Sequence, residues 1–339
     1  MRCSGKWTKF GVIKVHSLKT KSNRLNNKPL RYNRVITLSQ KQNSENAIWA
    51  DVSVVIVTYN SAAVIESCLK PLLAAVKIIV VDNGSTDSTC TTVQHVSSDI
   101  EIIRNDKNIG FGAAINLGMA QVDTRYGFAI NPDAITQPGA LEHLIDVADK
   151  FPGSAIICPQ IHNKKGDLEM PVMGPGEIHH QPMRQSVGGD FCTWFVTGAA
   201  LLYRTVAWRD IGGYDETMFL YSEDNDLAIR MSKRGYSMII APAAEVIHSG
   251  GGSSKPSSHI LWLKNWHMTW SHLYLTGKHV HENVARQEAK RMAVRYFLKA
   301  TLYWVVFRWD KARRDGARFS ACFTYLFKPF SVARQMGER

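Results

Sequence analysis

The stretch Val52-Ser-Val-Val-Ile-Val-Thr-Tyr59 decides the fold of this 339-residue chain. It is a continuous, mostly β-branched apolar run, which is typical of a strand buried on both faces of a parallel sheet. Asn60-Ser61 follows and offers a helix cap, and residues 62–75 have the spacing of an amphipathic helix. A strand followed directly by a helix predicts an α/β domain that begins near residue 50.

The alternation of strand and helix continues along the chain. Further strands are expected at 77–82, 100–104, 126–130, 155–159, 195–203 and 236–241, and helices at 138–150 and 224–234. Polar residues end three of these strands, at Thr58-Tyr59-Asn60, Asp82-Asn83 and Asp133. Ligands of open α/β sheets bind beyond the carboxyl ends of the strands, so these residues are predicted to face one site.

Charge is distributed unevenly. Residues 1–50 carry eleven Lys/Arg against one acid, residues 286–339 thirteen against four, and residues 51–285 seventeen against twenty-four. An acidic body argues against a nucleic-acid partner, because a phosphate-reading surface puts positive charge on the folded domain itself. Basic ends suit an anionic membrane surface instead.

The expected organisation has three parts: a basic, poorly ordered tail at 1–49, a catalytic domain at 50–258 and an aromatic, basic helical extension at 259–339. No apolar run reaches the roughly eighteen residues of a spanning helix, and residues 1–41 lack the continuous apolar stretch that a secretory signal is expected to have. The six cysteines are scattered without CxxC spacing, which favours a reducing compartment. We therefore expect a cytoplasmic protein that is peripheral on the inner face of the membrane.

An acidic cluster, Tyr221-Ser-Glu223-Asp224-Asn-Asp226-Leu227, lies some ninety residues after a second acidic signal, Asn131-Pro132-Asp133. Carboxylates this dense are costly to hold beside apolar runs unless a metal, a sugar or a reacting proton lies between them. The alternative is a solvated acidic turn, because charge runs are usually exposed. The cluster alone leaves both interpretations open.

A glycine-bearing loop, Asn108-Ile-Gly110-Phe-Gly112-Ala-Ala-Ile-Asn116-Leu-Gly118, feeds the helix that ends near Gln121. It is not a dinucleotide fingerprint, since its spacing differs and it follows the third strand rather than the first. This argues against a nicotinamide enzyme. A tight turn with Asn116 on a helix face is the alternative to a ligand-binding loop.

In this order, the motifs resemble those of the family 2 inverting nucleotide-sugar glycosyltransferases, and within them the rhamnosyltransferase-like branch. The resemblance covers about residues 52–270. It implies the GT-A fold, with a mostly parallel central sheet flanked by helices, here followed by a C-terminal helical extension. The residues that carry it are Val57-Thr58-Tyr59-Asn60, Val81-Asp82-Asn83-Gly84-Ser85-Thr86-Asp87, Asn108-Ile109-Gly110-Phe111-Gly112 with Asn116, Asn131-Pro132-Asp133, Gly212-Gly213-Tyr214-Asp215, Glu223-Asp224-Asn225-Asp226-Leu227 and His248.

The resemblance implies that a nucleotide-diphosphate sugar, linked to dTDP or UDP, binds along the strand ends. Asp82 would accept a hydrogen bond from the N3–H of uracil or thymine, because a carboxylate only accepts. A helix N-cap is the alternative for Asp82, and strand-end packing is the alternative for Tyr59. The residues implied in nucleotide and donor binding are Thr58, Tyr59, Asn60, Asp82, Asn83, Asn108, Gly110, Phe111, Gly112, Asn116, Asn131 and Asp133.

Asn131-Pro132-Asp133 stands where the family carries its Asp-x-Asp metal motif. The resemblance therefore implies that Asp133 binds a Mg²⁺ or Mn²⁺ ion bridging the diphosphate, with His248 as a further ligand. Asn131 replaces the first Asp of the usual motif and removes one anionic ligand. A structural role is the alternative for His248.

Asp224 matches the family's catalytic base, which takes the proton of the acceptor hydroxyl as it attacks the anomeric carbon. Glu223 and Asp226 are implied as supporting residues, although Asp226 could equally cap the helix. Trp194 and Gly198 are expected to line the acceptor pocket, since an aromatic face stacks on a sugar ring.

The implied reaction moves a sugar, with rhamnose from dTDP-rhamnose as the leading candidate, to a hydroxyl of a glycan or polyprenyl-linked acceptor in bacterial surface polysaccharide synthesis. A nucleotidyltransferase of related fold is one alternative, although Thr58-Tyr59-Asn60-Ser61 lacks its Gly-rich, Lys-containing loop. A non-catalytic subunit that binds nucleotide or sugar is another. In the extension, Trp262, Trp266 and Trp270 share one helical face, which is expected to pack in a core. The alternative is that the aromatic, basic segment after His259 docks on the membrane; its aromatic residues are Trp262, Trp266, Trp270, Tyr274, Tyr296, Phe297, Tyr303, Trp304, Phe307 and Trp309.

Overall fold

The computed structural model describes residues 49–169, 189–250 and 257–327. The predicted tail at 1–49 lies outside the described residues except for Trp49. Within the described ranges, no helix combines the length and the apolar character needed to cross a bilayer.

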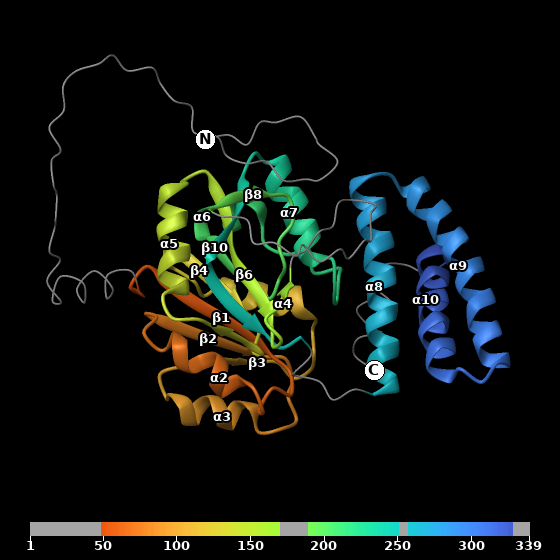
Figure 1. The fold of residues 1–339 in the computed structure, drawn as a ribbon, viewed down its shortest axis with the longest axis horizontal. Coiled ribbons are helices and arrows are strands. Elements are labelled where there is room, and N and C mark those ends of the chain that lie inside the picture. The colour runs from red at the N-terminus through yellow and green to blue at the C-terminus, as the bar shows by residue number, and fades with distance from the viewer. Residues whose placement is uncertain (1–48, 170–188, 251–256, 328–339) are drawn as a thin grey trace, which may run out of the picture.

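A mixed sheet forms the centre of the molecule (Figure 1). Its strand order is β3-β2-β1-β4-β9-β6-β10-β5, with β7 beside β6 and β8 beside β10. The first four strands in this order are parallel, and β9 runs antiparallel between β4 and β6. The strands are β1 (Val52–Thr58), β2 (Lys77–Asp82), β3 (Glu101–Arg104), β4 (Tyr126–Ile130), β5 (Ala134–Thr136), β6 (Ser154–Asn163), β7 (Leu168–Glu169), β8 (Phe191–Thr193), β9 (Ala200–Arg204) and β10 (Ser237–His248).

Helices cover both faces of the sheet, and β1 shows why. All seven of its residues are buried: Val54 and Ile56 enter the core on one face, and Val55 and Val57 enter the core on the other. Each such side chain contributes about 1.5–3 kcal/mol through burial. The first core is closed by α2 (Ile65–Leu69), the 3₁₀ helix η1 (Lys70–Leu72), α3 (Thr89–Val96) and α5 (Ala140–Lys150), and the second by α4 (Phe111–Met119), α6 (Thr205–Ile211) and α7 (Glu223–Lys233).

Three long helices form a separate layer beside the sheet domain, at the blue end of the colour bar in Figure 1. They are α8 (Ser258–His279), α9 (Glu282–Val305) and α10 (Trp309–Phe327). Their shared core includes Trp266 and Trp270, which are 0% and 2% exposed, with Trp262 packed against it. The tryptophan face of α8 therefore packs inward, as the core-packing alternative expects, and docking of the extension on a membrane stays a prediction.

The structure differs from the sequence expectation in several elements. The helix expected at 62–75 is the shorter α2 followed by η1, and the strand expected at 155–159 runs on to Asn163 as β6. Two further strands also differ. The strand expected at 195–203 starts only at Ala200, because the amide of Gly198 donates to Asp224 instead of to a neighbouring strand. The strand expected at 236–241 runs on to His248 through a bulge: Ala241 pairs with Pro159 of β6, and Glu245 pairs with the next residue, Gln160.

Candidate active site

The ends of β1 and β2 bring two predicted donor-binding residues together. Thr58 and Asp82 are register partners in this parallel pair, and the Thr58 hydroxyl donates to Asp82 Oδ1 at 3.0 Å. Asp82 Oδ2 accepts from the Ser85 amide at 3.1 Å, and the side chain is fully buried. The carboxylate thus holds the turn after β2. It is not the N-cap of α3, which begins only at Thr89.

Tyr59 and Asn60 form the rim of this edge. The Tyr59 side chain is 42% exposed, so strand-end packing does not account for it. Asn60 has φ of 51°, its Oδ1 accepts from the Thr86 amide at 2.9 Å, and its own amide donates to Ser85 Oγ at 2.8 Å. These bonds fix an otherwise uncommon left-handed conformation at the point where the chain leaves β1.

Asparagine side chains attach the glycine-bearing loop to the end of β2. Asn83 Nδ2 donates to Asn108 Oδ1 and to the Gly110 carbonyl, each at 3.1 Å. Asn83 Oδ1 accepts from Asn105 Nδ2 at 3.0 Å. Sequence analysis missed Asn105, because a lone asparagine after a strand carries no motif.

The glycines of this loop serve close packing. Gly110 has φ of 95°, and a Cβ there would lie 2.6 Å from the carbonyl oxygen of Phe219, which also accepts from the Phe111 amide at 3.0 Å. A Cβ on Gly112 would lie 3.0 Å from Tyr214 Cβ. The loop is therefore pressed against the segment that leads into the acidic cluster.

Asn116 holds the same segment from α4. Its Nδ2 donates to the Tyr214 carbonyl at 3.0 Å and to Glu216 Oε1 at 3.2 Å, and its Oδ1 accepts from the Tyr214 amide at 2.9 Å. Both amide protons are thus taken by residues 214–216. In this arrangement Asn116 is a structural clamp, and its donor contact stays a prediction.

Asp224 meets the strand ends through residues 198 and 199. The Gly198 amide donates to Asp224 Oδ2 at 3.2 Å, while the Ala199 carbonyl accepts from the Asn131 amide at 2.9 Å. A Cβ on Gly198 would lie 3.8 Å from the ring of Phe111. The predicted base, the Asn131-Pro132-Asp133 segment and the glycine-bearing loop therefore belong to one region of the molecule.

The acidic cluster is presented by strained backbone. Tyr221 and Ser222 both have φ of 68°, although neither is glycine. Such residues cost on the order of 1–3 kcal/mol each and gather at functional sites. Helix α7 starts immediately afterwards, so Glu223 and Asp224 lie in its first turn, where the helix dipole favours negative charge.

The two carboxyl groups occupy a desolvated environment. Burial raises the pKa of Glu223, and the charge of Asp224 raises it further. Burial also raises the pKa of Asp224, against the amides of Asn225 and Gly198, which donate to its ionised form. Glu223 is only 7% exposed and its Oε2 accepts no hydrogen bond. The cluster is not a solvated turn, and adjacent carboxyls with raised pKa values are typical of proton-transfer sites.

Asp226 has a different environment from its neighbours. It is fully buried, and its oxygens lie 2.6 Å from Arg230 Nε, 2.7 Å from Lys278 Nζ and 2.7 Å from His279 Nε2. Burial works against ionisation, but the bonds from His279 and Lys278 outweigh it and lower the Asp226 pKa. Asp226 therefore does not cap α7, whose N-cap is Ser222; it links α7 to the last turn of α8, and its supporting role in the site stays a prediction.

The predicted metal ligands also lie together. His248 pairs with Ala134 in the ladder between β10 and β5, and its Nε2 lies 3.3 Å from Asp133 Oδ1 and 3.5 Å from Asn131 Nδ2. Across the described ranges, no group of three or more His, Cys, Asp or Glu residues could hold a metal unaided. The protein therefore offers one carboxylate and one imidazole at this edge.

Trp194 is half-buried between β8 and β9, four residues before Gly198. It lies on the segment that continues to Gly198, whose amide donates to Asp224, and its placement on the acceptor side stays a prediction. Its stacking on a sugar stays a prediction.

Residues 53–210 match the family described as glycosyl transferase family 2. An N-acetylglucosaminyl-diphospho-decaprenol L-rhamnosyltransferase of Mycobacterium tuberculosis (strain ATCC 25618 / H37Rv) is 28% identical over 268 residues, which are 67% of this chain and 84% of that protein.

Two solved structures share the fold. A mannosyltransferase from Pyrobaculum calidifontis in complex with GDP-Man and Mn²⁺ superposes with a TM-score of 0.50 at 14% identity, over 82% of this chain and 87% of its own. GalNAc-T7 with UDP, GalNAc and Mn²⁺ gives 0.53 at 12% identity, over 84% of this chain and 56% of its own. The predicted GT-A fold with C-terminal helices is confirmed.

Proposed function

We propose, from the match of residues 53–210 to glycosyl transferase family 2, that this glycosyltransferase inverts the anomeric centre of a nucleotide-linked deoxyhexose. The proposed donor is dTDP-rhamnose, and the proposed acceptor is a hydroxyl of a lipid-linked glycan in cell-envelope polysaccharide synthesis. The observation that carries the proposal is the position of Asp224, bonded to Gly198 beside the Asn131-Pro132-Asp133 segment.

Asp224 is the proposed general base. As the acceptor oxygen bonds to the anomeric carbon, the bond from that carbon to the diphosphate breaks, and the hydroxyl proton passes to an Asp224 oxygen. A single displacement needs one base within hydrogen-bond reach of the nucleophile. The raised pKa of Asp224 makes it a better proton acceptor than an exposed aspartate. The Gly198 amide fixes the orientation of its carboxylate.

The donor is proposed to lie over the ends of β1, β2 and β4. Asp82 is fully buried under this edge and accepts from Thr58 and Ser85, so an imide N–H of a pyrimidine base would reach its remaining lone pairs only if the turn after β2 opens. Tyr59 exposes its ring beside this position, where it can stack on the base.

The residues present fit a divalent cation. Asp133 and His248 supply a hard oxygen and a nitrogen 3.3 Å apart, and two protein ligands suit an ion that completes its shell with phosphate and water oxygens. Asp133 and His248 would hold a Mg²⁺ or Mn²⁺ ion, with Asn131 alongside. When bound, such an ion would offset the charge that develops on the departing diphosphate.

Substitution of Asp224 by Asn tests the proposal. We expect release of dTDP from dTDP-rhamnose, with an N-acetylglucosaminyl-diphospho-lipid acceptor, to fall by roughly 10²–10⁴-fold while dTDP binding persists. Asp146→Asn is the matched control, because Asp146 is an exposed carboxylate on α5. Unchanged turnover in Asp224→Asn would show that Asp224 is not the general base. Nucleotide binding by the native chain without turnover of any sugar donor would instead favour a non-catalytic subunit.

A further inference from the structure

The tip of the α9–α10 hairpin exposes eight large apolar side chains. In α9 and the turn that follows, Val305, Val306 and Phe307 are 58%, 49% and 75% exposed. The other large apolar side chains of this tip are Phe297, Leu298, Leu302, Trp304 and Trp309, each more than 45% exposed. An apolar patch of this extent on a water-soluble surface marks an interaction site.

The tip is preformed. The Trp309 ring packs edge-on against Trp304 and against Phe307, with ring centroids 5.9 and 5.7 Å apart. Phe307 has φ of 58°, a strained conformation for a bulky residue, and it is also the most exposed of these apolar residues. The backbone thus holds an aromatic side chain outward at an energetic cost.

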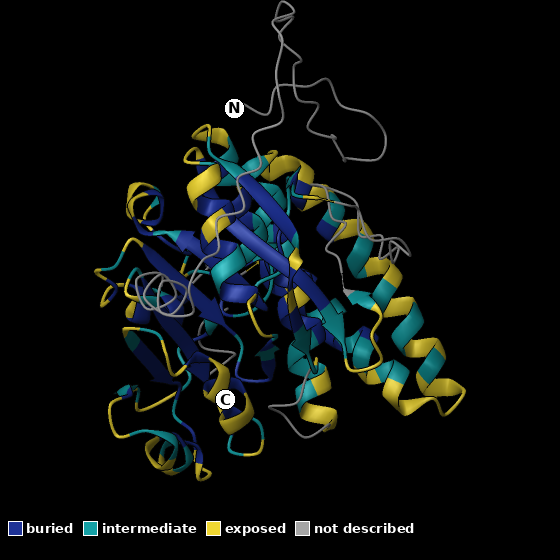
Figure 2. Ribbon diagram, turned by 60° about the vertical axis from the view of Figure 1, so that its left-hand side comes forward, coloured by how far each residue is buried: buried dark blue, intermediate teal, exposed yellow. Residues whose placement is uncertain are grey.

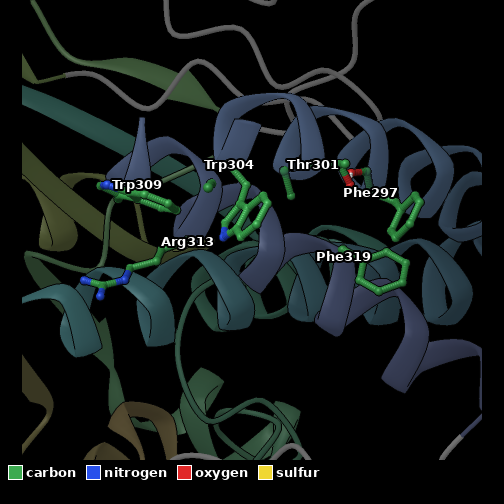
Figure 3. A pocket seen from close by; sticks show the side chains of 8 residues that line it. Phe297, Thr301, Trp304, Trp309, Arg313 and Phe319 are labelled. Atoms are coloured by element: carbon green, nitrogen blue, oxygen red, sulfur yellow. Dashed lines mark hydrogen bonds between the residues drawn. The ribbon is translucent and has the colours of Figure 1, made fainter. Parts of the chain in front are cut away.

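A groove of about 620 Å³ opens between the two helices at this tip. Figure 3 shows Phe297, Trp304, Trp309 and Phe319 along its walls, with Arg313 at one end. Its lining combines apolar and aromatic side chains with a guanidinium, which suits hydrocarbon chains that carry an anionic head.

The charge around the tip is positive. Residues 282–327 contain ten Lys/Arg and four Asp/Glu. Three of the acids are engaged within the layer: Asp315 with Arg314 and Arg318, Glu288 with His272, and Glu282 with Tyr325. Arg291, Arg295, Arg308 and Arg313 are exposed. Figure 2 shows the exposed outer faces of this layer in yellow, in contrast to the buried sheet.

We propose that the tip around Trp304, Phe307 and Trp309 docks the enzyme on an anionic lipid bilayer, with the aromatic rings at the headgroup level and the arginines on lipid phosphates. Aromatic and basic side chains together are what interfacial segments use. Docking at a bilayer rests on the proposed function, because a lipid-linked acceptor lies at such a surface.

Flotation of the full chain with vesicles tests the proposal. We expect the native protein to float with vesicles of phosphatidylcholine and phosphatidylglycerol, and more weakly with phosphatidylcholine alone or at high salt. A triple variant, Trp304→Ser/Phe307→Ser/Trp309→Ser, should lose vesicle binding by at least about 10-fold. The matched control replaces Leu73, Val76 and Val206, three exposed apolar residues of the sheet domain, with Ser and should float normally.

Two results would contradict the proposal that the tip docks on a bilayer. One is flotation of the triple variant at the native level. The other is a native chain that does not bind vesicles, including one that dimerises through residues 304–309 instead. Turnover with a water-soluble acceptor separates this test from that of the proposed function. The triple variant should keep that turnover and lose turnover with acceptor embedded in vesicles. If no acceptor is glycosylated while flotation behaves as expected, the proposed reaction fails and the docking surface stands.

Discussion

Lys278 Nζ lies 2.7 Å from Asp226 Oδ1, and this ion pair joins the last turn of α8 to the first turn of the helix that carries Asp224. The same ammonium lies 2.6 Å from Asp215 Oδ2, just before the strained Tyr221 and Ser222. A residue of the C-terminal layer therefore holds both ends of the segment that presents the proposed base. The extension is part of the construction of the site.

Asp226→Asn should cost about 3–5 kcal/mol of unfolding free energy, because it leaves Arg230, Lys278 and His279 without their shared anion. Urea unfolding at neutral pH measures the change. Asp210→Asn, which removes an exposed pair with Arg234, should cost far less, because solvent screens this pair. Equal, small losses in both variants would show that the α7–α8 link does not stabilise the fold.

Glu223→Gln should stabilise the protein increasingly as pH rises. The folded-state pKa of Glu223 lies above its ordinary value, through burial and the charge of Asp224, so its favourable contribution is present at low pH and is lost as pH rises through that raised pKa. Gln carries no such dependence. In thermal unfolding, the Tm values of Glu223→Gln and the native protein should differ little near pH 5. Near pH 8 the Tm of the variant should be higher, by roughly 2–4 °C for each kcal/mol of stability gained. Glu142→Gln, in the first turn of α5, serves as control; a gain that does not depend on pH would contradict the assigned cause.

Acid should weaken the link between α8 and the 215–226 segment. Burial opposes ionisation of Asp215, but bonds from Lys278 and Thr217 lower its pKa to about 2. Its contribution is therefore complete above the ordinary pKa of 3.8 and disappears as pH falls toward 2. Native protein should lose stability more steeply than Asp215→Asn in this range. Parallel curves in urea titrations at several pH values would argue against this role.

Two glycines near Asp224 should respond differently to alanine. Gly110→Ala forces a Cβ to 2.6 Å from the Phe219 carbonyl at φ of 95°, so we expect a loss of roughly 1–3 kcal/mol. Gly198→Ala places a methyl group 3.7 Å from Asp224 Oδ2, an ordinary contact that leaves the fold intact but narrows the space beside the proposed base. Its KM for acceptor should rise several-fold at unchanged Tm. A destabilised Gly198→Ala would indicate a packing role instead.

Sequence reasoning predicted the parts that local pattern controls. The buried run of β1 and the polar strand ends at Thr58, Asp82 and Asp133 follow directly from residue type and spacing. The partners of Asp226 could not be predicted, because Lys278 and His279 lie more than fifty residues away and lack any motif. Pairing over such a distance is set by tertiary packing.

The C-terminal extension was likewise only partly predictable from the sequence. The spacing of Trp262, Trp266 and Trp270 correctly predicts one helical face, but periodicity cannot distinguish a core from an interface. The structure places that face inward and exposes Trp304 and Phe307 instead. Their surroundings depend on how α9 and α10 pair, which the sequence pattern leaves open.

The bulge in β10 has a consequence for the Asp133–His248 pair. Residues 242–244 lie outside the ladder with β6, at a point where Pro242 has no amide hydrogen to donate. If the strand continued without this interruption, His248 would lie three positions farther along, about 10 Å at ~3.3 Å per residue. An odd displacement would also turn its imidazole toward the opposite side of the sheet. The bulge at 242–244 therefore places the His248 imidazole beside the Asp133 carboxylate. An insertion or deletion at 242–244 would separate the two side chains more readily than a substitution elsewhere in β10.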